Sequence, residues 1–110
     1  MSYENILTET DGELLVVTLH WPERRNAMNH QMRVDLMECA RKAEANDAIK
    51  AIVFTGDGDK SFCAGANIPE LSERTLASEM GEAATLRKEL PTTIERLGKP
   101  SVAAINGYCF

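Results

Sequence analysis

A run of small residues in the middle of the chain constrains the fold more than any other feature. The stretch Phe62–Ile68, with the sequence FCAGANI, follows the apolar run Ala51–Thr55 and the polar turn Gly56–Ser61. It therefore lies where a buried strand has ended and the chain turns towards a helix. Small side chains allow close approach to the backbone and leave peptide N–H groups uncovered, and such groups can stabilise an oxygen that becomes negative during a reaction. The same run also fits an ordinary tight strand-to-helix turn, and at this point both interpretations stay open.

The N-terminal half shows a hairpin followed by a helix. Two β-type runs, Ile6–Thr10 and Leu14–Leu19, flank Asp11-Gly12, a dipeptide typical of hairpin turns. The second run is almost unbroken apolar, which predicts a strand covered on both faces. Asn29 is a suitable N-cap for a helix reaching to about Asn46. The apolar stripe expected on that helix consists of Met32, Leu36, Cys39, Ala40 and Ala43.

The C-terminal half repeats the alternation of strand and helix. We expect a buried strand at 49–55, a short helix at 68–73, a helix over 76–97 that Pro91 kinks or divides, and a buried strand at 101–105. One apolar helix face is expected to carry Met80, Ala83, Leu90, Ile94 and Leu97. Strands that alternate with helices predict an α/β fold, and residues 1–110 form part of a single domain with no linker or repeat.

Composition excludes several classes of function. The 110 residues carry a net charge of −5, which argues against nucleic acid as a partner, because phosphates need a basic face. The absence of a long apolar run and of a charged-then-apolar leader predicts a cytoplasmic protein that does not span a membrane. The three cysteines have no metal-ligand spacing, so we expect reduced thiols. The acidic turn Gly56-Asp57-Gly58-Asp59 lacks the further ligands of a calcium site, so no metal is expected.

Three motifs in fixed order carry a family resemblance. They are Trp21–Met28 (WPERRNAM), Phe62–Ile68 (FCAGANI) and Gly98–Tyr108 (GKPSVAAINGY). Together they resemble the crotonase superfamily, also called the enoyl-CoA hydratase/isomerase family, whose usual patterns are P-x-x-x-N-A-L/M, F-x-A-G-A-D-I/L and K-P-x-V-A-A-I-N-G. The resemblance implies a spiral of ββα units. The chain would be the N-terminal part of that fold, about two-fifths of the family's typical length, because its last residues are apolar and follow a buried strand directly.

The resemblance also implies a chemistry. In the family, the backbone N–H of the residue at position 66, here Ala66, is one of two donors that stabilise the thioester oxygen of an acyl-CoA. The second donor is a glycine, and it would follow Phe110, as would the catalytic carboxylates. Ala64 and Gly65 would be small because the thioester lies against them. Coenzyme A would be present only as part of the substrate, and no tightly bound cofactor is implied.

The resemblance assigns further residues to coenzyme A. Arg24 and Arg25 match the family's first CoA-binding loop, and a planar guanidinium suits a phosphate; exposed loop arginines are the plainer alternative. Asn26 is expected to brace that loop. Asn67 stands where the family usually has aspartate, so the charge is lost although the shape is kept, and a role as helix N-cap fits it equally. Ile68 is the last residue that the resemblance predicts to contact the acyl-CoA.

Enoyl-CoA hydratase is the activity that the resemblance favours. Isomerases, decarboxylases and hydrolases of the same superfamily remain alternatives, as does a paralogue that binds coenzyme A or partner subunits without catalysis. Relatives commonly form trimers or paired trimers, so a homo-oligomer is expected. His20 and His30 have no evident carboxylate partner in the sequence, so neither is expected to act as a base.

Overall fold

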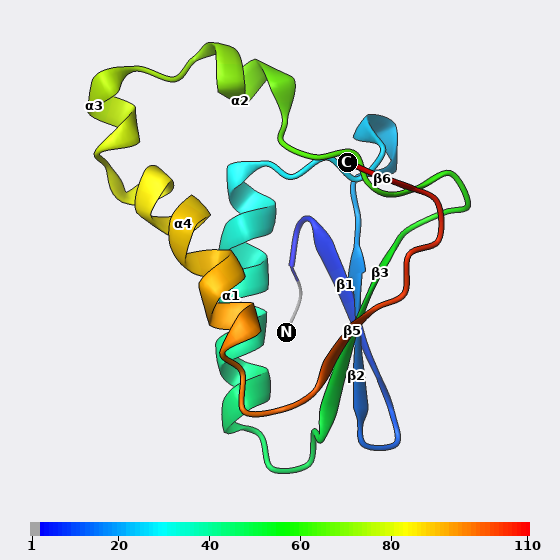
Figure 1. Ribbon diagram of the computed structural model, residues 1–110. Helices are drawn as coiled ribbons and strands as arrows, with labels where there is room; N and C mark the ends of the chain where they lie inside the picture. Colours follow the sequence, from blue (N-terminus) through cyan, green and yellow to red (C-terminus); the bar gives the residue numbers. More distant parts are fainter. Residues whose placement is uncertain (1–2) are drawn as a thin grey trace.

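The computed structural model describes residues 3–110 and is built around a four-stranded mixed sheet (Figure 1). The strands are β1 (Ile6–Asp11), β2 (Leu14–Leu19), β3 (Ala51–Gly56) and β5 (Ser101–Ala103), in the spatial order β1-β2-β3-β5. β1 is antiparallel to β2, whereas β2–β3 and β3–β5 are parallel. The parallel pairs need crossover connections, and helices supply them. The expected α/β order is confirmed.

The hairpin between β1 and β2 forms where the sequence predicts it. Asp11 pairs with Leu14, which leaves a two-residue loop, and Gly12 in that loop has φ of 61°, a value that glycine adopts without strain. β2 is buried on one face only, because Leu15, Val17 and Leu19 are buried while the residues between them are not. The expectation that both faces are covered was therefore wrong for the described chain.

The long helix α1 (His30–Ala45) covers the buried face of the sheet. Its N-cap is Asn29, whose side chain accepts a hydrogen bond from the Met32 N–H at 2.7 Å. The whole predicted stripe is buried, at Met32, Leu36, Cys39, Ala40 and Ala43. Of these, Met32, Leu36, Cys39 and Ala43 pack with side chains of β2 and β3 in one hydrophobic core.

The second helical region differs from the prediction. It contains three helices: α2 (Ile68–Ser72), α3 (Leu76–Glu79) and α4 (Glu82–Glu95). The helical structure is interrupted at Met80 and Gly81, because glycine is a poor helix former and follows a helix of only four residues. α4, in contrast, continues through Pro91. Pro91 is exposed, so the carbonyl that loses its N–H partner can be hydrated. Met80 was expected on the apolar face, but it is exposed, whereas Leu90 is buried and Ile94 and Leu97 pack against the core.

Two smaller strands form a separate parallel ladder. β4 (Ser61–Cys63) pairs with β6 (Tyr108–Cys109), next to the short 3-10 helix η1 (Pro22–Arg24). β5 was expected to be buried, yet all its residues are exposed, and Val102 is 57% exposed. The reason is its place at the edge of the described sheet, where no further element lies against it. Within residues 3–110, no helix is long and apolar enough to cross a membrane.

Candidate active site

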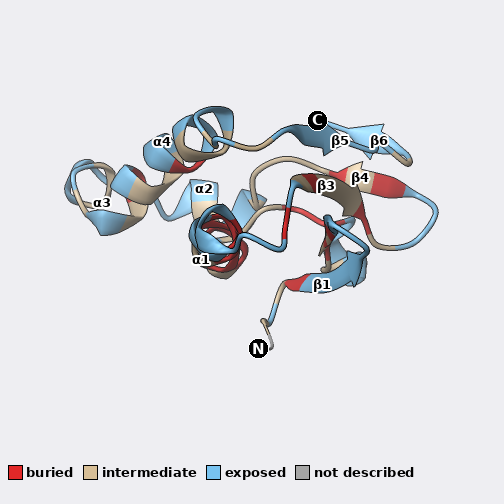
Figure 2. Ribbon diagram, turned by 90° about the horizontal axis from the view of Figure 1, so that it is seen from below, coloured by how far each residue is buried: buried red, intermediate tan, exposed pale blue. Residues whose placement is uncertain are grey.

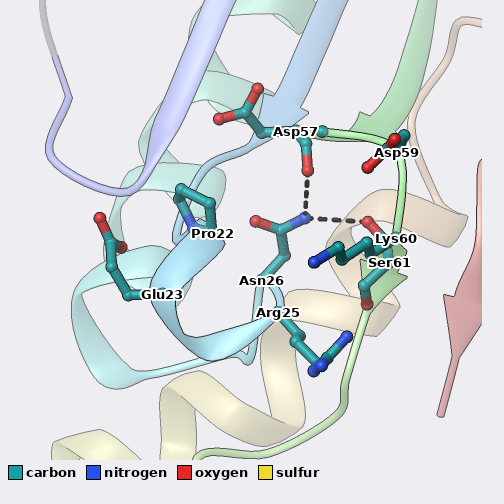
Figure 3. A pocket seen from close by; sticks show the side chains of 9 residues that line it. Pro22, Glu23, Arg25, Asn26, Asp57, Asp59, Lys60 and Ser61 are labelled. Carbon is teal, nitrogen blue, oxygen red and sulfur yellow. Dashed lines mark hydrogen bonds between the residues drawn. The ribbon is translucent and has the colours of Figure 1, made fainter.

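Three segments that are distant in sequence meet beside the carboxyl ends of β2 and β3. The centre of this arrangement is Asn26, which is only 1% exposed. Its side-chain oxygen accepts the Trp21 N–H at 2.9 Å, and its amide donates to the carbonyls of Asp57 at 3.0 Å and Ser61 at 2.9 Å. Figure 3 shows the amide between these two carbonyls. The expectation that Asn26 braces the loop is confirmed.

A second asparagine holds the same turn from the other side. The Asn106 side chain donates to the carbonyls of Gly56 at 2.9 Å and Gly58 at 3.0 Å, and it accepts the Gly56 N–H at 3.0 Å. Sequence reasoning missed this role, because Asn106 precedes glycine and reads as a simple turn residue. The two asparagines together fix the 56–61 turn, which leads into β4 and the small-residue run.

The small-residue run is paired with the 25–28 segment. Met28 and Ala66 form a parallel bridge, in which the Met28 N–H donates to Gly65 at 2.7 Å and the Asn67 N–H donates to Met28 at 3.0 Å. The Ala64 N–H donates to the carbonyl of Arg25 at 3.1 Å. Alternate peptide groups of an extended chain point to opposite sides, so the N–H of Ala66 points away from Met28. No acceptor for that N–H occurs among residues 3–110.

The run is partly open to solvent. Ala64, Gly65 and Ala66 are all partly exposed, so the turn is not sealed inside the protein. Gly65 has φ of 96°, a conformation that L side chains rarely adopt. A Cβ at this position would also lie 3.4 Å from the carbonyl oxygen of Phe110, whose N–H donates to Cys63 at 2.9 Å. The backbone after β6 therefore passes directly beside the turn.

Burial keeps the cysteine of this run protonated. Desolvation raises the pKa of the Cys63 thiol, and the Gly65 N–H, which donates to the sulfur, only partly opposes this effect. Burial likewise raises the pKa of Cys39 to about 11. Nucleophilic cysteines need a lowered pKa, so the geometry favours the expectation of plain reduced thiols. All three cysteines of the chain are free.

A cavity of about 350 Å³ lies next to Asn26, which is one of its lining residues. Its walls come from η1 and from the 57–61 turn (Figure 3). Arg25 and Lys60 bring positive charge to its edge, and three carboxylates, those of Glu23, Asp57 and Asp59, bring negative charge. Arg25 adopts a left-handed backbone conformation, with φ of 52°. Among the described residues, no three or more His, Cys, Asp or Glu side chains, those of this cavity included, are arranged so that they could hold a metal ion.

The structure separates the expected coenzyme A contacts. Arg25 borders the cavity, whereas Arg24 is exposed and does not line it. Asn67 occupies the N-cap position of α2, but its side chain makes no capping hydrogen bond, so the capping alternative holds for position only. Ile68 is exposed at the start of α2. Contact of these residues with a ligand stays a prediction.

One expectation about the histidines was wrong. His20 has a carboxylate partner, because its Nδ1 lies 2.6 Å from Oδ2 of Asp57. The two residues are 37 positions apart, so only the parallel pairing of β2 with β3 brings them together. His30 uses its backbone rather than its ring, since its N–H donates to Glu70 at 2.9 Å.

Comparison with known proteins defines the class. The model of the family described as Enoyl-CoA hydratase/isomerase matches residues 9–110. The chain is 33% identical to the crotonyl-CoA hydratase of Syntrophomonas wolfei, over 98% of this chain and 41% of the relative. It is 32% identical to the 1,2-epoxyphenylacetyl-CoA isomerase of Escherichia coli, over 94% of this chain and 40% of the relative. A solved enoyl-CoA hydratase/carnithine racemase from Magnetospirillum magneticum superposes with a TM-score of 0.86 at 30% identity, over 94% of this chain and 39% of the other.

The chain belongs to the enoyl-CoA hydratase/isomerase family, the crotonase superfamily. Its fold is the N-terminal part of the crotonase fold, as the motifs imply. The chain spans about two-fifths of the length of the curated relatives it matches, 41% of the first of them.

Proposed function

We propose that the full-length protein is an acyl-CoA-processing enzyme, and specifically an enoyl-CoA hydratase. The observation that carries the proposal is the backbone N–H of Ala66. It points away from the Met28 bridge, it has no acceptor among the described residues, and it lies in a partly exposed turn of small residues. A rigid, uncharged backbone donor in such a place suits an oxygen whose negative charge grows during the reaction.

The chemistry that this donor would serve is addition of water to a 2-enoyl-CoA. The oxygen of water bonds to C3, a proton is delivered to C2, and the thioester oxygen carries negative charge in the enolate-like intermediate. Ala66 would supply one hydrogen bond to that oxygen. The second donor and the carboxylates that move the protons would come from residues that follow position 110 in the full-length protein, as the family resemblance implies.

The rest of the substrate would extend from this turn. Ala64 and Gly65 would lie against the thioester, and Asn67 and Ile68 would flank the pantetheine. Arg25, which borders the cavity described above, would contact a phosphate of coenzyme A. Arg24, which does not line that cavity, would lie further out. In this proposal coenzyme A enters only as part of the substrate, no cofactor is held tightly, and the protein works in the cytoplasm as a homo-oligomer, a trimer or a hexamer.

Ala66→Pro in the full-length protein tests the proposal. Proline removes the N–H but keeps a small side chain, and the N–H of Ala66 makes no structural bond in the described chain. We expect kcat to fall at least about a hundredfold, as for loss of one oxyanion donor, while the Kd for coenzyme A stays within about threefold. The loss of crotonyl-CoA absorbance measures turnover, and Ala66→Ser, which keeps the N–H, is the matched control. Unchanged turnover in Ala66→Pro would exclude Ala66 as a donor.

Isomerisation of an acyl-CoA is the second candidate. The similarity to an isomerase at 32% identity is nearly as high as the similarity to a hydratase. Both reactions need the same stabilised thioester oxygen, so Ala66 would have the same role in each. Conversion of 3-butenoyl-CoA to crotonyl-CoA, without formation of a 3-hydroxy product from crotonyl-CoA, would favour isomerisation. Binding of coenzyme A with no turnover of any enoyl-CoA would favour a non-catalytic paralogue.

A further inference from the structure

Arg33 is a buried cation next to the small-residue turn, and neither the motifs nor the family patterns single it out. It lies on α1, one turn after the N-cap, and is only 6% exposed. Desolvation lowers the pKa of its guanidinium, and Glu70 opposes this effect. A guanidinium remains charged at any ordinary pH, so the protein holds a buried charge here and must compensate for it.

Two partners compensate the charge: the carbonyl of Met28, which pairs with the turn that carries Ala66, and the carboxylate of Glu70, in the helix that follows that turn. Nη2 of Arg33 donates to the carbonyl oxygen of Met28 at 3.1 Å, and Nη1 donates to Oε1 of Glu70 at 3.3 Å. That Met28 oxygen also accepts the Asn67 N–H at 3.0 Å. Arg33 therefore fixes the carbonyl that forms one half of the bridge around Ala66.

Glu70 closes the arrangement from the other side. Its second oxygen, Oε2, accepts the N–H of His30 at 2.9 Å, in the first turn of α1, where a negative charge is favourable. Glu70 also belongs to α2, which begins one residue after Asn67. The segment from Gly65 to Glu70 is thus attached to the 28–33 segment at both ends, by backbone bonds at one end and by the carboxylate at the other.

We infer that Arg33 and Glu70 are positioning residues that hold the peptide N–H of Ala66 in the direction in which it meets the thioester oxygen. The inference rests on the proposed function of Ala66. The turn needs such support, because residues 64, 65 and 67 lie outside regular helix or strand and Gly65 has a left-handed φ. Small displacements of a catalytic donor cost much of its effect, so a side-chain clamp on the neighbouring carbonyl is a means of control.

The test uses the full-length protein and compares Arg33→Met with Arg41→Met. Both arginines lie on α1, but Arg41 is exposed and far from the turn. We expect kcat on crotonyl-CoA to fall about tenfold or more in Arg33→Met, with KM and the Kd for coenzyme A within about threefold, because a misplaced donor weakens the transition state more than the ground state. Arg41→Met should stay within about twofold of the unmodified protein in every parameter.

A spectroscopic measurement separates positioning from plain stability. Butyryl-CoA labelled with ¹³C at the thioester carbonyl is saturated and cannot be hydrated, so its infrared carbonyl band reports hydrogen bonding in the bound state. The band of the unmodified complex should lie below that of free butyryl-CoA. In Arg33→Met it should return towards the free position, although the ligand is bound. Arg33→Lys should recover part of the shift, because one ammonium can still donate to Met28.

The outcomes distinguish two failures. No band shift and no turnover in the unmodified protein would remove the proposed function, and this inference with it. A band shift and turnover that are the same in Arg33→Met as in the unmodified protein would overturn the inference alone. Should Arg33→Met not fold, Arg33→Lys and Glu70→Gln take its place, with Glu38→Gln on the exposed face of α1 as the control for the second. An intermediate band position in both would support positioning, and an unmodified band in both would exclude it.

Discussion

Two adjoining parts of the molecule are held in place by different means. The turn frame, residues 21–28 and 56–67, is fixed by the buried amide side chain of Asn26 and by backbone bonds between segments far apart in the chain. The arm, residues 68–81 with α2 and α3, contains no buried residue in either helix. Figure 2 shows α3 entirely in the colours of exposed and partly exposed residues, while β4 and α1 contain buried ones. Ion pairs of Glu70 with Arg33 and of Glu79 with Arg87 link the arm to α1 and α4.

The difference follows from what each part must do. A backbone donor stabilises charge only when its direction is fixed, and a network of satisfied buried polar groups supplies that rigidity. The frame has such a network, with Asn26 at its centre. The arm carries apolar side chains that are exposed in the described chain, at Ile68, Leu71, Leu76 and Met80. Because removing one of these exposed side chains changes the packing little, a substitution in the arm should lower the free energy of unfolding much less than one in the frame.

The largest effect is expected at Asn26. Asn26→Ala removes three hydrogen bonds and leaves the Trp21 N–H and the carbonyls of Asp57 and Ser61 without their partner. It also places alanine at φ of 58°, which asparagine tolerates better. We expect the free energy of unfolding to fall by about 4 kcal/mol, measured by chemical denaturation.

Asn46→Ala is the matched control for that substitution. Asn46 is exposed at the end of α1, and among residues 3–110 its side-chain oxygen accepts a hydrogen bond only from the N–H of Ala48. A loss of less than about 1 kcal/mol is expected there. Equal losses at the two positions would show that the amide network does not hold the frame.

A smaller loss is expected from the apolar support beneath the frame. Leu36 on α1 is 3% exposed and belongs to the hydrophobic core. Leu36→Ala should lower the free energy of unfolding by about 3 kcal/mol, since it removes buried methyl groups and leaves a cavity. Val34→Ala, at a position on the same helix that is partly in solvent, should cost less than about 1 kcal/mol. If the two variants melted at the same temperature, α1 would not be the packed support that its burial indicates.

A large part of the fold could be predicted from signals that are local in the sequence. The Asn29 cap, the stripe on α1 and the hairpin at Gly12 depend on residues close together in sequence, and all three are confirmed. Asn26 was predicted to brace its loop because its motif was familiar. The direction of the Ala66 N–H needs the bridge to Met28, which periodicity cannot show.

Interactions between distant residues account for most of what the sequence did not show. His20 meets Asp57, and Arg33 meets Glu70, only after the sheet and α1 have brought them together. Each of these residues reads as an ordinary polar position in the sequence. Gly81 is a local signal for the interruption between α3 and α4, but the sequence prediction placed the interruption at Pro91, because proline disfavours a helix more strongly than glycine. An exposed proline is tolerated inside a helix when water can bind the carbonyl that it leaves unpaired.

The smallest effect is expected in the arm. Leu76 is 81% exposed, at the first position of α3. Leu76→Ser should change the free energy of unfolding by less than about 0.5 kcal/mol, because almost none of its apolar surface leaves water when the described chain folds. Measured beside Leu36→Ala, it compares an exposed helical leucine with a buried one. A loss above about 1 kcal/mol in the full-length protein would mean that another part of that protein, or a second copy of it, packs on the arm. Concentration dependence of the melting temperature would then distinguish the two, because only packing between copies varies with protein concentration.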